Sequence, residues 1–234
     1  MTKELLLDAK PMTGTVGKYL PLTITIVNKG KLEPLWDYIV DKYHYLGYDN
    51  MIGQRIKYLV ICGSIPIAAL SYNRAALKVG VRDTFIGYDE DGKKTFLKHI
   101  VNNNRFLILP WIKIKNLASY LLSQTLKMLK TDWLKMYGVQ PLLVETFVDN
   151  SKYKGTCYKA ANWTYLGETK GFSKEGNTFV YHGNKKAVYL YILNKDYKSQ
   201  VPIPCHQPHY KRERVPNMML HQPDWSPDLL AEIG

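Results

Sequence analysis

Two apolar segments separated by one long helical segment constrain the fold of this chain more than any other feature. Residues 106–109 form a continuous apolar run, which is typical of a strand buried on both faces of a sheet. From Asn116, a favourable helix N-cap, leucines recur at the spacing of one helical face, and a second apolar run follows at 141–149. The pattern predicts a right-handed unit of strand, crossover helix and parallel strand, and sites in such sheets lie where the strands end.

Charged side chains in these two strands are the first candidates for chemistry. Arg105 stands at the head of the first strand, where it either pairs with Glu145 or Asp149 or binds an anion. Glu145 lies inside the second strand, where burial could raise its pKa enough for a general base, or where it simply neutralises Arg105 or Arg82. Asp149, at the end of that strand, is a second candidate base or the cap of a following helix.

The segment 150–171 predicts a helix of about two turns and then an aromatic strand closed by Gly167. The apolar strand before this segment is followed by a short helix that contains Tyr158 and then by Asn162, Trp163 and Gly167. This order resembles the last strand-helix-strand unit of the GNAT acyltransferases. The resemblance implies an α/β fold of the α+β kind, with a mixed, mostly antiparallel central sheet flanked by helices. It also implies that Tyr158 is the general acid toward the departing thiolate of coenzyme A.

Six motifs between about 43 and 171 together resemble the family typified by DruA of the Druantia anti-phage systems. They are YHYLGY (43–48), RDTFIGY (82–88), NNNRFLILP (102–110), NLAS (116–119), ETFVD (145–149) and GTCYKAANW (155–163). This resemblance implies a DNA-acting protein in a phage-defence or mobile-element context, with other defence-system proteins as further partners. A more distant resemblance is to the Mom-type phage enzymes, which act on adenine in DNA. It rests on Arg105, Ser119, Asp149 and Tyr158.

The turn before the long helix departs from the acyltransferase pattern. It reads WIKIKNLAS (111–119) and contains no glycine, whereas only glycines let backbone N–H groups close on a pyrophosphate at a helix N-terminus. Acetyl-CoA or another acyl donor is one option, and the sequence leaves the cofactor undetermined. We expect Arg105, Asn116 and Ser119 to hold an anionic donor.

A net charge of +12 favours a polyanionic partner such as DNA or another nucleic acid, with a lysine-rich solvated surface as the alternative. Tyrosines beside cations strengthen the first interpretation, because stacking on unpaired or flipped bases requires such pairs. The candidate nucleic-acid contacts are His44, Tyr45, Lys113, Lys115, Lys211 and Arg212.

Length and composition predict one main domain with two appendages. We expect a leader with an edge strand over 1–30, the GNAT-like domain over 31–195, and a basic, proline-rich extension over 196–234. Cys205, His206 and His209 suggest a metal site, but a fourth ligand at known spacing is missing, so we predict none. Three cysteines, and the lack of an apolar leader or a membrane-length run, predict a cytoplasmic protein.

Three local predictions concern segments outside the central unit. We predict a short helix over 74–79, a loop with an acidic turn over 82–94, and a hairpin formed by 178–183 with 186–193.

Two functional classes follow from these observations. The first is a GNAT-like group transferase that modifies a nucleic-acid base, with Tyr158 as acid and Asp149 or Glu145 as base. The second is the same scaffold binding DNA without turnover, in an anti-phage or transposon-linked complex. A metal-dependent nuclease is a weaker third alternative, in which Glu145 and Asp149 gather a divalent ion with Asp83 and Asp89.

Overall fold

Seven strands form one mixed sheet in the order β2-β3-β4-β5-β7-β11-β8, and every neighbouring pair except β5 and β7 is antiparallel. The computed structural model describes residues 9–48, 53–175, 178–181 and 183–202, and only the backbone of 172–175, 178 and 179. These strands are β2 (Thr23–Ile26), β3 (Arg55–Cys62), β4 (Ile65–Arg74), β5 (Ile100–Ile108), β7 (Leu143–Asp149), β8 (Thr164–Glu168) and β11 (Lys186–Ile192). The predicted fold class, a mostly antiparallel sheet flanked by helices, is confirmed.

Helices cover both faces of this sheet. The α-helices of the described residues are α1 (Glu33–Tyr43), α2 (Gly80–Ile86), α3 (Glu90–Phe96), α4 (Leu117–Tyr137) and α5 (Thr156–Ala160). Short 3-10 helices lie at Val16–Tyr19, Leu97–His99 and Lys195–Gln200. None of the helices in the described part of the chain is both long and apolar enough to cross a lipid bilayer.

Neighbouring residues of β3 show which helix lies on which face. Tyr58 donates a hydrogen bond to Asp132 of α4 (2.7 Å), whereas the ammonium of Lys57 contacts Glu33 of α1 (2.7 Å). Since successive strand residues point to opposite faces, α1 and α4 cover opposite faces of the sheet. Lys57 is fully buried and is also bonded to Asp37 and to Tyr48, so its charge is compensated.

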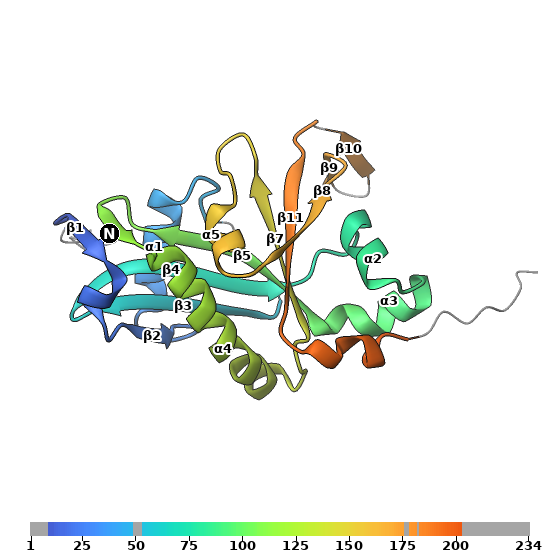
Figure 1. Cartoon of the computed structure of the whole chain (residues 1–234), viewed down its shortest axis with the longest axis horizontal. Helices are drawn as coiled ribbons and strands as arrows, with labels where there is room; N and C mark the ends of the chain where they lie inside the picture. The colour runs from blue at the N-terminus through green and yellow to red at the C-terminus, as the bar shows by residue number, and fades with distance from the viewer. Residues whose placement is uncertain (1–8, 49–52, 176–177, 182, 203–234) are drawn as a thin grey trace, which may run out of the picture. The chain divides into compact units, whose positions relative to one another are not determined.

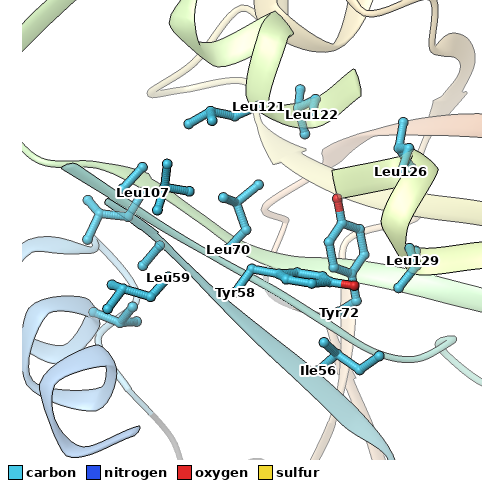
Figure 2. Close-up of a cluster of buried hydrophobic side chains, with 14 of the residues drawn as sticks. Ile56, Tyr58, Leu59, Leu70, Tyr72, Leu107, Leu121, Leu122, Leu126 and Leu129 are labelled. Atoms are coloured by element: carbon cyan, nitrogen blue, oxygen red, sulfur yellow. The ribbon is translucent and has the colours of Figure 1, made fainter. Parts of the chain in front are cut away.

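An apolar core fills the space between the sheet and α4. Figure 2 shows the side chains of Leu70 and Tyr72 between the sheet and the leucines of α4, among them Leu126 and Leu129. The Tyr72 hydroxyl shares a hydrogen bond with Thr125 (2.8 Å), so its polar atom is satisfied inside the core. The predicted crossover helix is therefore confirmed as the element that covers this face.

The N-terminal segment joins the domain through two strands. β2 pairs with β3 at the edge of the sheet, so the predicted edge strand is confirmed. β1 (Met12–Thr15) pairs in parallel with β6 (Ile112–Lys115), the strand that leads into α4. Of the predicted C-terminal extension, residues 203–234 lie outside the described residues.

Two local predictions on the chain between β4 and β5 are wrong. No helix forms over 74–79, because the backbone N–H of Ala76 donates to Glu145 and its C=O accepts from Arg82. The predicted loop over 82–94 instead contains α2 and α3. The acidic turn begins a helix, since the Asp89 carboxylate accepts the N–H of Gly92 (2.7 Å) and thereby caps α3.

The predicted hairpin of 178–183 with 186–193 is also wrong. β10 (Thr178–Tyr181) pairs with β9 (Phe172–Glu175), and β11 pairs with β7 on one side and with β8 on the other. A continuous apolar run is typical of a strand inside a sheet, and such a strand pairs along both of its edges.

Candidate functional site

The parallel neighbours β5 and β7 pair at one end and then separate. Residues 100–102 pair with 143–145, and we call the point where this pairing stops the vertex. Beyond the vertex, β5 stays paired with β4 and β7 with β11, so the two strands diverge, as Figure 1 shows. Strand edges that face each other without pairing leave backbone N–H and C=O groups for a ligand.

Glu145 fixes the vertex on the side of α2. Its buried carboxylate accepts hydrogen bonds from the Arg82 guanidinium and from the backbone N–H of Ala76, both at 2.7 Å. Burial raises the pKa of Glu145, and the charge of Arg82 opposes that shift. The sequence leaves two roles open for Glu145, and the geometry shows the one in which it pairs with an arginine. Arg82 also pairs with Asp83 (2.6 Å).

A second network fixes the vertex on the opposite side, toward α5. The Thr146 hydroxyl donates to the backbone C=O of Asn103 (2.9 Å), in the place of a strand hydrogen bond. The Tyr158 hydroxyl donates to the side-chain oxygen of Asn103 (2.9 Å), whose amide nitrogen donates to the C=O of Ser71. Burial raises the pKa of Tyr158 well above its usual range, so its hydroxyl stays protonated and acts as a donor.

A pocket of about 450 Å³ opens where the strands diverge. It is lined by the segment 43–46 after α1, by 103, 104 and 106–108 of β5, by 146–148 of β7, and by 153–158. The first of these segments lies on the α1 face, whereas α5 packs beside α4 on the other face. The pocket therefore passes between the strands from one face of the sheet toward the other, with Tyr158 in its lining.

Aromatic rings from two loops meet at the mouth of this pocket. The ring centroids of Tyr45 and Tyr153 are 5.4 Å apart, and those of His44 and Tyr45 are 4.9 Å apart. The Lys152 ammonium lies 4.6 Å from the centroid of the Tyr45 ring, a cation–π contact. Tyr153 is 51% exposed although it is a large aromatic residue. We call Tyr45, Tyr153 and Lys152 the aromatic clamp. Rings beside a cation are suited to stacking on a planar ligand.

His44 is a neutral hydrogen-bond donor rather than a base. Its Nδ1 accepts the backbone N–H of Leu46 (3.3 Å), which leaves the proton of the neutral ring on Nε2. Burial, reinforced by the charge of Arg105, lowers the pKa of His44 to about 4. The ring can therefore donate from Nε2 toward a ligand at neutral pH.

Asp149 organises the turn that carries Lys152 and Tyr153 of the aromatic clamp. Its carboxylate accepts hydrogen bonds from the backbone N–H (3.0 Å) and the hydroxyl (2.6 Å) of Ser151. These hydrogen bonds lower the pKa of Asp149. Its backbone C=O accepts the N–H groups of Lys152 and Tyr153. Asp149 does not line the pocket, and the predicted role as base stays a prediction for it and for Glu145.

The three residues predicted to hold an anionic donor lie in two different places. Arg105 donates from Nε to the backbone C=O of Gly47 (3.1 Å), and so supports the loop that carries His44. Asn116 and Ser119 stand at the start of α4, where the Ser119 hydroxyl donates to the C=O of Asn116 (3.2 Å). Asn116 has a left-handed backbone (φ 63°) and makes no side-chain cap.

Within the described residues, the lysines predicted to contact nucleic acid do not lie together at the pocket. Lys113 and Lys115 are exposed on β6, opposite Thr13 and Thr15 of β1, and do not line the pocket. The remaining predicted contacts and the suspected metal ligands lie outside the described residues: Lys211, Arg212, Cys205, His206 and His209. Within the ranges that are described, no three His, Cys, Asp or Glu side chains are placed to hold a metal ion.

Four residues of the site are absent from our sequence-based candidates: Asn103, Thr146, Lys152 and Tyr153. A signal existed for Asn103, because a run of three asparagines inside an otherwise apolar strand needs partners for its amides. Thr146, within an apolar strand, gave no comparable signal. Tyr153 and Lys152 could be assigned only after the turn was known to fold back toward Tyr45.

One family model matches this chain, and several solved structures are similar to it. The family model described as Druantia protein DruA matches residues 2–178. An N-acetyltransferase from Staphylococcus aureus Mu50 is similar in structure, with 13% identity, a TM-score of 0.46, and coverage of 74% of this chain and 97% of that one. The ribosomal-protein-S18-alanine N-acetyltransferase from Escherichia coli shows 8% identity, a TM-score of 0.48, and coverage of 74% and 94%. None of the curated proteins matches the chain.

Gly155 lines the pocket and packs closely against Tyr189, and replacing this glycine tests that packing. Its φ is +65°, and a Cβ there would lie 2.5 Å from the Tyr189 hydroxyl oxygen. Gly138, at the end of α4, has the same backbone (φ +67°) with open space around it. We expect Gly138→Ala to lower the free energy of unfolding by about 1–2 kcal/mol from backbone strain alone. Gly155→Ala should lower it by about 1–3 kcal/mol more, because of overpacking. If urea unfolding shows that both variants lose the same free energy of unfolding, the close packing of Gly155 against Tyr189 is contradicted.

His44 gives a pH-dependent prediction. Its pKa is about 4 in the folded chain against 6.5 for an ordinary histidine, so the unfolded state binds more protons between these values. The contribution of His44 to stability is therefore present above pH 6.5 and lost as the pH falls toward 4. Between pH 7 and 4, wild type should lose more free energy of unfolding than His44→Gln. A proton NMR titration of His44 with its midpoint near 6.5 would refute this.

Proposed function

Because the chain belongs to the family of the Druantia protein DruA, we propose that it acts on DNA as a group transferase that modifies a base, in a phage-defence or mobile-element context. The observation that carries the proposal is the pocket at the vertex, which joins the aromatic clamp on the α1 face to the Tyr158 hydroxyl toward α5. A base and a donor of the transferred group could meet there from opposite sides of the sheet.

The donor side lies between the diverging strands, near Tyr158. The start of α4 does not fit the pyrophosphate of coenzyme A. The strand β6 leads directly into Asn116, and its residues Ile112 and Ile114 are buried. The segment has no glycine at which a phosphate could approach the backbone closely. We therefore derive no step through coenzyme A, and propose an activated acyl donor of another kind.

In the proposed reaction, the exocyclic amine of the base attacks the carbonyl carbon of this donor. An N–C bond forms, the bond from the carbonyl carbon to the leaving group breaks, and the leaving group departs with the electron pair. Tyr158 stabilises that anion by turning its hydroxyl from Asn103 toward it, as its GNAT-like position suggests. The proton of the amine passes to water, since Glu145 and Asp149 do not line the pocket.

One observation favours the second candidate function, a DNA-binding module without turnover. Each predicted acid or base is already engaged: Glu145 with Arg82, Asp149 with Ser151, and Tyr158 with Asn103. A scaffold that only binds DNA would keep these groups for structure. Nothing in such a module requires the Tyr158 hydroxyl to be released.

Mass analysis of nucleosides from DNA of expressing cells separates the two functions. We expect a nucleoside of increased mass in cells with wild type, and the added mass identifies the transferred group. Tyr158→Phe should reduce it about 100-fold or more, because the donor to the leaving group is lost. Tyr72→Phe is the matched control, since it also removes a buried tyrosine hydroxyl from a hydrogen bond, with Thr125, away from the pocket.

The alternative outcomes are equally definite. Unchanged nucleosides with wild type, together with DNA binding that weakens as salt rises, would favour the binding module. Equal reduction by Tyr158→Phe and Tyr72→Phe would show that the hydroxyl acts through stability alone.

A further inference from the structure

A second pocket adjoins the first across the side chain of Phe147. It is a groove of about 1170 Å³ between α2 and α3 on one side and the ends of β8 and β11 on the other. Phe147 lines both pockets, from a position on β7 just beyond the vertex. A ligand that occupies the first pocket can therefore continue into the groove across one aromatic ring.

Positive charge from separate elements converges on this groove. Lys78 follows β4, Lys170 follows β8, and Lys186 begins β11. Lys170 is exposed and Lys186 is half-buried. Cations borne by separate elements along one groove suit an extended chain of negative charges better than a single small anion.

The acidic residues of the groove are partly neutralised within the protein. Asp83 is held by Arg82 (2.6 Å) and by Lys93 (2.8 Å). Glu168 accepts a hydrogen bond from the amide of Asn150 (2.9 Å). Glu90 is the remaining acid in the lining, and its carboxylate points largely to solvent, 4.0 Å from Lys93.

Positive charge also bridges the clamp and the groove. Lys152 belongs to the clamp and Lys186 to the groove, and both lower the pKa of Asp149, which lies between them on β7. Lysines therefore stand at both ends of the path from the Tyr45 ring past Phe147 to the groove, with the Asp149 carboxylate between them. Polynucleotide single strands are bound by this combination, in which rings stack on bases and cations follow the phosphates.

We propose that the chain binds single-stranded DNA across Phe147, with one unpaired base stacked against the aromatic clamp and the adjoining phosphates along Lys170 and Lys186. The proposal deepens the proposed function, on which it rests in placing the target base in the pocket, and it defines the target as unpaired. A base inside a duplex cannot stack on a protein ring unless it is first extruded.

Fluorescence of 2-aminopurine in a 12-nucleotide single strand tests the clamp in the full chain. Stacking quenches this base, so we expect quenching when wild type binds, and none with a duplex of the same sequence. Tyr45→Leu and Tyr153→Leu should each weaken binding about tenfold and reduce the quenching. Tyr165→Leu is the control, because Tyr165 is similarly exposed (49%) and lines neither pocket.

The salt dependence of the same binding tests the groove. Lys170→Ser with Lys186→Ser should lower the slope of log K against log salt by about 1.4, for two phosphate contacts to a single strand. Lys127→Ser with Lys130→Ser, on the exposed side of α4, removes the same charge and should leave the slope unchanged. The tail 203–234 is present in every variant, so its contribution cancels.

Each outcome decides the proposal. Quenching that survives both tyrosine changes, or an equal effect of the two lysine pairs on the slope, would overturn it. Failure of the proposed function has a different signature, because nucleoside mass reports the chemistry whereas quenching and slope report the bound strand. Stacking without a modified nucleoside would leave this inference standing.

Discussion

The whole site depends on one constraint, the point at which β5 and β7 stop pairing. Two parallel strands in register would continue to pair unless other contacts took the place of the hydrogen bonds between them. Here Glu145 binds Arg82 and the N–H of Ala76 on one side, and Thr146 donates to Asn103 on the other. Because both sides are fixed by short hydrogen bonds, the strands separate at a defined residue, and a pocket takes the place of a closed sheet.

This constraint explains why the residues with the most suggestive chemistry serve structure first. Glu145 is needed as an ion to hold Arg82, and an uncompensated charge at either position would be costly in the core. Asp149 shapes the turn that presents Tyr153, and Arg105 supports the loop of His44. The lining of the pocket includes aromatic rings, hydroxyls and amides, which can recognise and orient a planar molecule.

Much of the fold could be predicted from the sequence, because the apolar runs of β5 and β7 and the leucine spacing of α4 report burial directly. The site could be predicted less well. Arg82 and Glu145 are 63 residues apart, and the sequence offers Arg82 only as one of two arginines that Glu145 could neutralise. The turn after β7 brings Tyr153 to Tyr45 only because β5 and β7 diverge. A contact between two such loops leaves no periodic pattern of residues in the sequence.

Photocross-linking with single-stranded DNA that carries 5-iodouracil tests the central claim most directly, since this base couples to aromatic side chains in contact with it. If the pocket at the vertex receives the base, cross-links in wild type fall on Tyr45 or Tyr153 and disappear in competition with unmodified single strand. Cross-links confined to α4 or to β6 and its neighbour β1, with none on the 43–46 and 153–158 segments, would contradict the assignment of this pocket.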